Sequence, residues 1–304
     1  MALVYSTTVT PSAKRASKTT PGPRSAARRG ALFALFALIA ALAAGLVAAD
    51  AEAQGPRANP APTAPAPQGY DRCLALARSN PTQAYSDANA WHENGGGFPA
   101  QHCAAVALVG MKKYPEAAAQ LEALSGSMMQ AEPSLRAEAL EQAGQAWLLA
   151  NKPNEAKSDF DAALAFKPKD PELLVDRAEA YALGGKLFEA VDDLNLVIDG
   201  APKRTDALIY RASAYRQLGS LDLARDDVDR ALSINPDAPA GLLERGNIRR
   251  LQGDDAGAKA DWQRIVALVP NSGEAAAAKD NLDRLAAGPP PGDKLTTAPP
   301  AKKP

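Results

Sequence analysis

The sequence predicts an all-α protein assembled from a repeated pair of helices, and two observations carry this prediction. Alanine and leucine are abundant and aromatic residues make up only 5% of the chain, a composition that favours helix. Proline also recurs every 34 residues, at Pro168, Pro202, Pro236 and Pro270. Because proline lacks a backbone donor and stops a helix, each of these residues closes one unit of an array of stacked helices.

The remaining prolines separate the folded body from the ends of the chain. Of the 25 prolines, eight lie before residue 70 and six after residue 287. We therefore expect the folded body to span residues 70–287, preceded by a Pro-rich linker over 54–69 and followed by a disordered Pro/Lys tail over 288–304.

Residues 1–53 have the organisation of a secretory signal peptide. Basic residues from Lys14 to Arg29 precede a charge-free stretch from Ala31 to Ala49, and Ala51-Glu52-Ala53 follows as a cleavage site. We expect cleavage near Ala53 and export to the periplasm of a Gram-negative bacterium. The alternative is an uncleaved anchor in the inner membrane that faces the periplasm, because the apolar stretch is just long enough to span a bilayer.

Charge excludes one class of partner. The formal net charge is −1, but residues 1–53 hold six Lys/Arg and two Asp/Glu, so the rest of the chain has 28 basic and 33 acidic residues, a net of −5. A nucleic-acid-binding protein needs a basic patch to displace counterions from phosphates, so we expect no nucleic-acid partner.

Four 34-residue units align without gaps over 137–170, 171–204, 205–238 and 239–272. Leucine fills the fourth position, at Leu140, Leu174, Leu208 and Leu242. The eighth position is small, at Gly144, Ala178, Ala212 and Gly246, and the twentieth is Ala156, Ala190, Ala224 and Ala258. The eleventh is Trp147, Tyr181, Tyr215 and the exception Arg249, and the twenty-fourth is Phe160, Leu194, Val228 and Trp262.

These spacings place two helices in each unit. Positions 4, 8 and 11 fall on one face of a first helix, and positions 20, 24 and 27 fall on one face of a second. Gly185, Gly219 and Gly253 stand between the helices, where a left-handed residue is easily accommodated, and Asn151 takes this place in the first unit.

The pattern resembles the tetratricopeptide repeat (TPR) family over four full repeats. The resemblance implies a helix-turn-helix solenoid wound as a right-handed superhelix, and together with the signal-peptide pattern it indicates an exported bacterial TPR protein. We further expect an N-terminal helix pair over 70–97, a divergent repeat over 98–136 with about five extra residues around Ser125 to Pro133, and a capping helix over 273–287 that Ser272 begins.

Charged residues recur at two further positions. Arginine occupies position 7 and aspartate position 23 in three units, sixteen residues apart, as Arg177 and Asp193, Arg211 and Asp227, and Arg245 and Asp261. A residue that recurs in successive units is expected to serve the helix-to-helix packing that all units share. We therefore predict that each arginine pairs with its aspartate between the two helices and does not bind a ligand.

Cys73 and Cys103 are the only cysteines. We predict a disulfide between them, which would limit the unfolded chain by about 3.7 kcal/mol for a loop of about 31 residues. Two reduced core residues are the alternative. With His92 and His102 they are also the only groups for thiol or histidine chemistry, and the sequence contains none of the common catalytic motifs. We expect no cofactor and no metal.

In TPR arrays the first helices line a concave surface, and the resemblance implies that positions 2, 5, 9 and 12 face a partner groove. A lysine and asparagine clamp for a carboxylate is not expected, since position 5 holds no lysine. The groove would change from acidic to apolar and then basic along the chain. Its residues are Glu138, Glu141, Gln145, Leu148, Glu172, Val175, Glu179, Ala182, Asp206, Ile209, Ser213, Arg216, Ala240, Leu243, Asn247 and Arg250.

We therefore expect a periplasmic scaffold that binds a protein or peptide partner in this groove without catalysis. One alternative is a membrane-anchored assembly factor of the cell envelope. The other is an enzyme or redox factor that uses Cys73 and Cys103 or His92 and His102.

Overall fold

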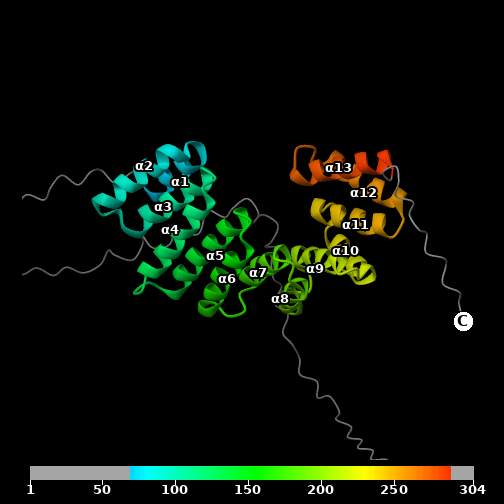
Figure 1. Ribbon diagram of the computed structural model, residues 1–304, viewed down its shortest axis with the longest axis horizontal. Helices are drawn as coiled ribbons and strands as arrows, with labels where there is room; N and C mark the ends of the chain where they lie inside the picture. Colours follow the sequence, from blue (N-terminus) through cyan, green and yellow to red (C-terminus); the bar gives the residue numbers. More distant parts are fainter. Residues whose placement is uncertain (1–68, 289–304) are drawn as a thin grey trace, which may run out of the picture. The chain divides into compact units, whose positions relative to one another are not determined.

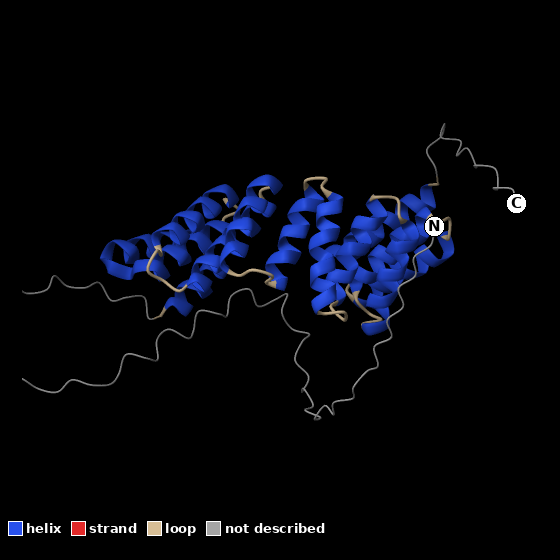
Figure 2. Ribbon diagram, turned by 90° about the horizontal axis from the view of Figure 1, so that it is seen from below, coloured by secondary structure: helices blue, strands red, loops and turns tan. Residues whose placement is uncertain are grey.

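Paired helices account for nearly all of residues 69–288, the part of the chain that the computed structural model describes. The predicted signal peptide, all of the linker except Gly69, and the tail beyond Gly288 lie outside these residues. Within them there is no strand, and short loops join the helices (Figure 2). The prediction of an all-α TPR solenoid is confirmed for this part of the chain.

The helices follow one another in chain order and each packs against the next (Figure 1). Their bounds are α1 Tyr70–Ser79, α2 Pro81–Trp91, a π-helical turn η1 His92–Gly96, α3 Gly97–Gly110, α4 Tyr114–Ser127, α5 Pro133–Leu149, α6 Pro153–Phe166, α7 Pro171–Leu183, α8 Leu187–Gly200, α9 Thr205–Gln217, α10 Leu221–Ile234, α11 Pro239–Leu251, α12 Asp255–Leu268 and α13 Gly273–Ala287.

The helix ends follow from the residues found there. Proline occupies the first turn of α5, α6, α7 and α11, where its missing N–H costs nothing. Asn151 takes a positive φ of 57° between α5 and α6, and Gly185, Gly219 and Gly253 have positive φ at the equivalent turns. Ser272 is the N-cap of α13, and its hydroxyl accepts a hydrogen bond from the Ala275 N–H.

One boundary differs from the expected one. Helix α5 begins at Pro133, four residues before the predicted start of its unit at Ala137, and so absorbs most of the extra residues that we expected around Ser125 to Pro133. Leu135 in this added turn packs against the apolar cluster between α4 and α5. Burial of Leu135 and a proline in the first turn both favour the longer helix.

The core lies between the two helices of each unit, where a small residue meets a large one. Gly144 on α5 contacts Phe160 on α6, and Gly246 on α11 contacts Trp262 on α12. Phe160 is completely buried and Trp262 nearly so. A Cβ at Gly144 would stand 2.6 Å from Cε1 of Phe160, so only glycine permits this approach. First helices of successive units also touch, as α7 touches α9 and α9 touches α11.

Replacing Gly144 with alanine tests this close approach. The added methyl group would push the buried Phe160 ring, and we expect the free energy of unfolding to fall by about 1–3 kcal/mol in urea denaturation followed by circular dichroism. Gly126→Ala on α4 is the control, because nothing lies within 4 Å of its new Cβ, and it should cause no loss. Equal stability of the two variants would contradict the contact.

Candidate functional site

The three predicted arginine and aspartate pairs are present, each as a two-pronged hydrogen bond between the helices of one unit. Arg177 Nε and Nη2 donate to the two carboxylate oxygens of Asp193 at 2.8 and 2.7 Å. Arg211 and Arg245 bind Asp227 and Asp261 in the same way. The aspartates are about 95% buried, and their hydrogen bonds raise the pKa of each arginine.

Each arginine also contacts the preceding unit, which sequence reasoning missed. Arg177 Nη1 donates to Asp161 on α6 at 2.7 Å, and Arg211 Nη1 donates to Asn195 on α8 at 2.7 Å. Arg245 lies 3.8 Å from Asp229 on α10. Asp161, Asn195 and Asp229 all occupy position 25, so a polar residue recurring there was the available signal. These arginines therefore join neighbouring units.

The cysteines and histidines of the described residues have structural partners. Cys73 on α1 and Cys103 on α3 form a disulfide, with Cα atoms 6.2 Å apart. His102 is buried, which lowers its pKa, and it lies between the Tyr70 hydroxyl at Nδ1 and the Gln142 Oε1 at Nε2. His92 is exposed and its Nε2 lies 3.4 Å from the Gln101 side chain. Residues 69–288 hold no His, Cys, Asp and Glu group with the arrangement of a metal site.

The predicted groove residues lie on the first helices α5, α7, α9 and α11, but they do not form one exposed surface. Val175 is buried in the core, and Ile209 and Leu243 pack against core clusters. Leu148 likewise packs against the cluster around Phe160. The assignment of Val175 to a partner surface was wrong, because contact between successive first helices buries position 5 there.

Several polar groove residues bridge successive first helices instead of pointing freely to solvent. The Gln145 amide on α5 donates to Asp176 on α7 at 2.8 Å. Arg216 on α9 donates to the buried Glu244 on α11 at 2.6 Å. Asn247 on α11 accepts a hydrogen bond from Asn281 on α13 at 3.0 Å.

The groove does not become basic at its C-terminal end as we expected, because Arg216 forms an ion pair with Glu244. Glu244 is only 6% exposed and neutralises the Arg216 guanidinium, and Arg250 is paired with Asp255 at 3.0 Å. Reversing the charge of Arg216 would place two carboxylates in a buried contact and destabilise the fold, so that substitution would not report on a partner.

Carboxylates instead dominate the surface of α5 and α7. Burial, followed by repulsion from Asp176 and Asp170, raises the pKa of Glu141 to about 7. Burial also raises the pKa of Asp176 to about 6. Glu138 contacts Lys167 at 3.5 Å, and the exposed Glu172 contacts Arg204 at 3.2 Å, beside Asp206. The arrangement concentrates negative charge at this part of the array.

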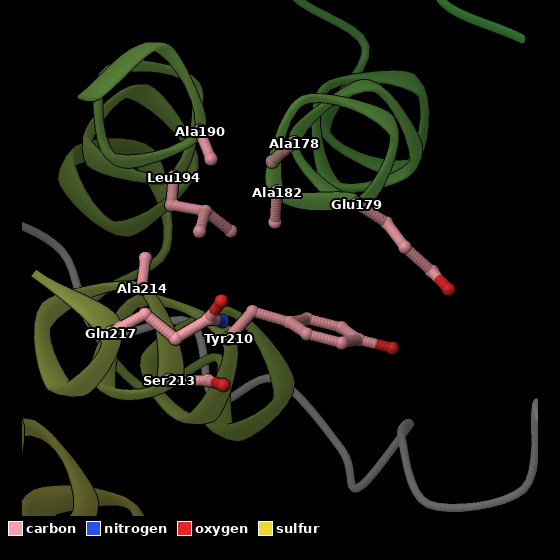
Figure 3. Close-up of a pocket in the computed structure, with 9 residues that line it drawn as sticks. All are labelled: Ala178, Glu179, Ala182, Ala190, Leu194, Tyr210, Ser213, Ala214 and Gln217. Atoms are coloured by element: carbon pink, nitrogen blue, oxygen red, sulfur yellow. The ribbon is translucent and has the colours of Figure 1, made fainter. Parts of the chain in front are cut away.

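A small pocket between α7, α8 and α9 includes three of the predicted groove residues (Figure 3). These are Glu179, Ala182 and Ser213, and the other polar lining residues are Tyr210 and Gln217. Figure 3 shows the Glu179 carboxylate and the Tyr210 hydroxyl ending on the same side of the pocket. The floor is formed by Ala178, Ala182, Ala190, Leu194 and Ala214.

The pocket suits a small apolar group that has a donor or a positive charge beside it. Its floor carries only methyl groups and the Leu194 side chain, whereas the Glu179 carboxylate, the Tyr210 and Ser213 hydroxyls and the Gln217 amide surround it. The pocket is far smaller than a site that encloses a whole ligand, so it suits a single small side chain.

Comparison with solved structures identifies the fold. A thermophilic TPR protein of Thermus thermophilus matches 59% of this chain and 96% of its own, with 19% identity and a TM-score of 0.50. A tetratricopeptide repeat protein of Parabacteroides merdae matches 71% and 84%, with 17% identity and a TM-score of 0.56. PilF of Pseudomonas aeruginosa matches 70% and 97%, with 15% identity and a TM-score of 0.50.

The chain therefore has the tetratricopeptide-repeat fold, as the 34-residue period predicted. No protein-family model and no curated protein matches the sequence. None of the helices between residues 69 and 288 combines the length and apolarity of a membrane span.

Removing the Arg177 side chain should cost far more stability than removing a surface arginine. Arg177→Ala leaves the buried Asp193 carboxylate without its cation, and we expect a loss of about 3–5 kcal/mol in urea denaturation. The control Arg225→Ala breaks an exposed pair with Asp222 and should cost about 0–1 kcal/mol. Similar losses for both variants would show that Arg177 does not join the units.

The disulfide predicts that the folded protein has no thiol that reacts with an alkylating reagent before reduction. After reduction and unfolding, mass spectrometry should detect two alkylated cysteines. Replacing both Cys73 and Cys103 with serine should lower the free energy of unfolding by about 2–4 kcal/mol, because the unfolded chain gains freedom. Two reactive thiols in the native, unreduced protein would refute the bridge.

Proposed function

We propose that this protein is a non-catalytic scaffold that binds a peptide segment of a protein partner on the first helices α5, α7 and α9. The observation that carries the proposal is the pocket between α7, α8 and α9, whose apolar floor adjoins the acidic surface of α5 and α7. The matching segment has a small apolar side chain, which enters the pocket, flanked by lysine or arginine, which meets Glu179, Glu141 and Glu172.

Two features of the described residues favour a scaffold over the enzyme and redox alternatives. Cys73 and Cys103 are joined to each other, so neither offers a free thiol. His102 has partners at both ring nitrogens, and the side-chain partner of His92 is the amide of Gln101. A general base would need a reacting group within hydrogen-bonding reach, and an amide is not a nucleophile that either histidine could activate.

The proposed location is the periplasm, with the signal peptide removed near Ala53. The basic, apolar and A-x-A order of residues 1–53 and the disulfide between Cys73 and Cys103 support it, because disulfides persist in oxidising compartments. The N-terminal sequence of the protein recovered from cells distinguishes this location from the membrane-anchored alternative. A chain that retains residues 31–49 and sediments with membranes would contradict cleavage.

Peptide binding tests the proposed surface. The probes are two fluorescent twelve-residue peptides of alternating residues, one of lysine with alanine or valine and one with glutamate in place of each lysine. We expect the basic peptide to bind at least tenfold more tightly in fluorescence polarisation at low salt, and its affinity to fall as salt is added. Equal binding of the two peptides would refute the acidic surface as the contact.

Variants locate the binding. Ala182→Leu fills the pocket and Glu179→Lys reverses the charge on its rim, and each should weaken the basic peptide at least tenfold without loss of helicity. Asp192→Lys, an exposed charge reversal on the second helix α8, is the matched control and should bind as the parent protein does. Affinity purification from periplasmic extract with the parent protein and Ala182→Leu then identifies the natural partner as the protein lost from the variant.

Binding should also strengthen with pH. Glu141 and Asp176 have pKa values raised to about 7 and about 6, so both carboxylates gain negative charge between pH 5.5 and pH 8. A lysine-rich peptide meets a more negative surface at the higher pH, and we expect its affinity to rise over this interval. Glu141→Gln should flatten the upper part of the profile, and an unchanged profile would show that Glu141 lies outside the contact.

A further inference from the structure

One junction of the array lacks the arginine that the later junctions have. Arg177, Arg211 and Arg245 each connect an aspartate at position 23 of their own unit to a polar residue at position 25 of the preceding unit. In the unit 137–170 the aspartate is retained as Asp159 on α6, but Ala143 on α5 occupies the place of the arginine.

The residue at position 25 of the preceding unit is also acidic. Ala117 on α4 corresponds to the alanine at position 20, so Glu122 corresponds to Asp161. Asp161 precedes Arg177 by 16 residues and Glu122 precedes Ala143 by 21, the difference being the five extra residues before Ala137. Glu122 and Asp159 are therefore the two acids that an arginine would connect.

In the structure the two carboxyl groups face each other without a cation. The Asp159 carboxyl lies within hydrogen-bonding contact of Glu122, and Asp159 is only 8% exposed. Its Oδ2 has no hydrogen-bond partner. The Trp147 indole on α5 donates to Glu122 Oε1 at 2.7 Å. This hydrogen bond replaces the one that an arginine donates to position 25 in the next unit. None of the ion pairs among residues 69–288 includes either carboxyl.

Neighbouring charged groups are engaged elsewhere. On α7, which packs against α6, Arg177 binds Asp161 and Asp193, and Asp176 binds Gln145. On α5, Glu138 contacts Lys167, which follows α6. On α3, which packs against α4, His102 lies between Tyr70 and Gln142. Glu122 is thus the charged group that acts on Asp159.

Two carboxyl groups in contact cannot both ionise at low cost, and a single proton between them relieves the repulsion and satisfies the unpartnered oxygen. We propose that Glu122 and Asp159 form a proton-binding site, which holds one shared proton where the three later junctions hold an arginine. The ligand of this site is the smallest cation, a proton.

The site makes the strength of this junction depend on pH near neutrality. Burial and then Glu122 raise the pKa of Asp159 to about 7, well above the value of a carboxyl in the unfolded chain. The stabilisation from the shared proton is therefore complete below the unfolded pKa and is lost as the pH rises through about 7. Above that pH both carboxylates are charged and repel each other across α4 and α6.

The indole of Trp147 provides a direct readout, because its N–H donates to Glu122. Tryptophan labelled with ¹⁵N gives three indole signals, from Trp91, Trp147 and Trp262, and Trp147→Phe assigns the relevant one. In the full folded protein we expect the Trp147 signal to shift between pH 5 and pH 9 with a midpoint near 7. A signal that does not shift over this range would overturn the proposal.

Three variants assign the titrating pair. Asp159→Asn, a neutral isostere, should abolish the shift near pH 7 while the circular dichroism spectrum stays unchanged. Ala143→Arg should also abolish it, because a restored arginine keeps both carboxylates ionised, and should raise the midpoint of thermal unfolding at pH 8. Glu141→Gln removes another group with a pKa near 7 and should leave the Trp147 titration intact. Persistence of the shift in Asp159→Asn, or its loss in Glu141→Gln, would assign the proton elsewhere and overturn the proposal.

Discussion

The close crossing of the two helices in each unit is the contact on which the rest of the structure depends. A small residue at position 8 faces a larger one at position 24, as Gly144 faces Phe160 and Gly246 faces Trp262. Positions 7 and 23 immediately precede these residues, so the same approach brings Arg177 to Asp193. Packing and charge pairing therefore have a single geometric origin, although the unit 137–170 keeps the crossing and has Ala143 in place of the arginine.

Sequence reasoning predicted the elements that recur at 34 residues. The helix pairs, the left-handed turns at Asn151 and Gly185, and the pairing of Arg177 with Asp193 all depend on register within a unit, which a fixed period reveals. It did not predict contacts between first helices of successive units. Arg216 and Glu244 are 28 residues apart, so their ion pair depends on the crossing of α9 and α11 and on side-chain length, which the period does not encode.

Contacts between successive first helices also explain why only some of the predicted groove residues line the pocket. Glu179 and Ser213 were predicted from position alone and do line the pocket, whereas Val175 is buried because two first helices meet over it. Two floor residues, Ala178 and Ala190, are the small residues of the helix crossing at positions 8 and 20. The repeat pattern therefore predicted part of the floor without identifying it as a pocket.

Ala143 affects how unfolding spreads from one unit to the next. In an array whose units contact only their neighbours, cooperativity passes through the junctions, and an arginine that holds three helices together couples the unfolding of two units. The junction between α4 and α6 lacks that coupling, while the disulfide holds α1 to α3 on one side of it. Cooperativity between α4 and α5 is therefore carried by their shared apolar cluster, which includes Leu121 and Ala143, and by the hydrogen bonds that Ser125 and Trp147 donate between the two helices.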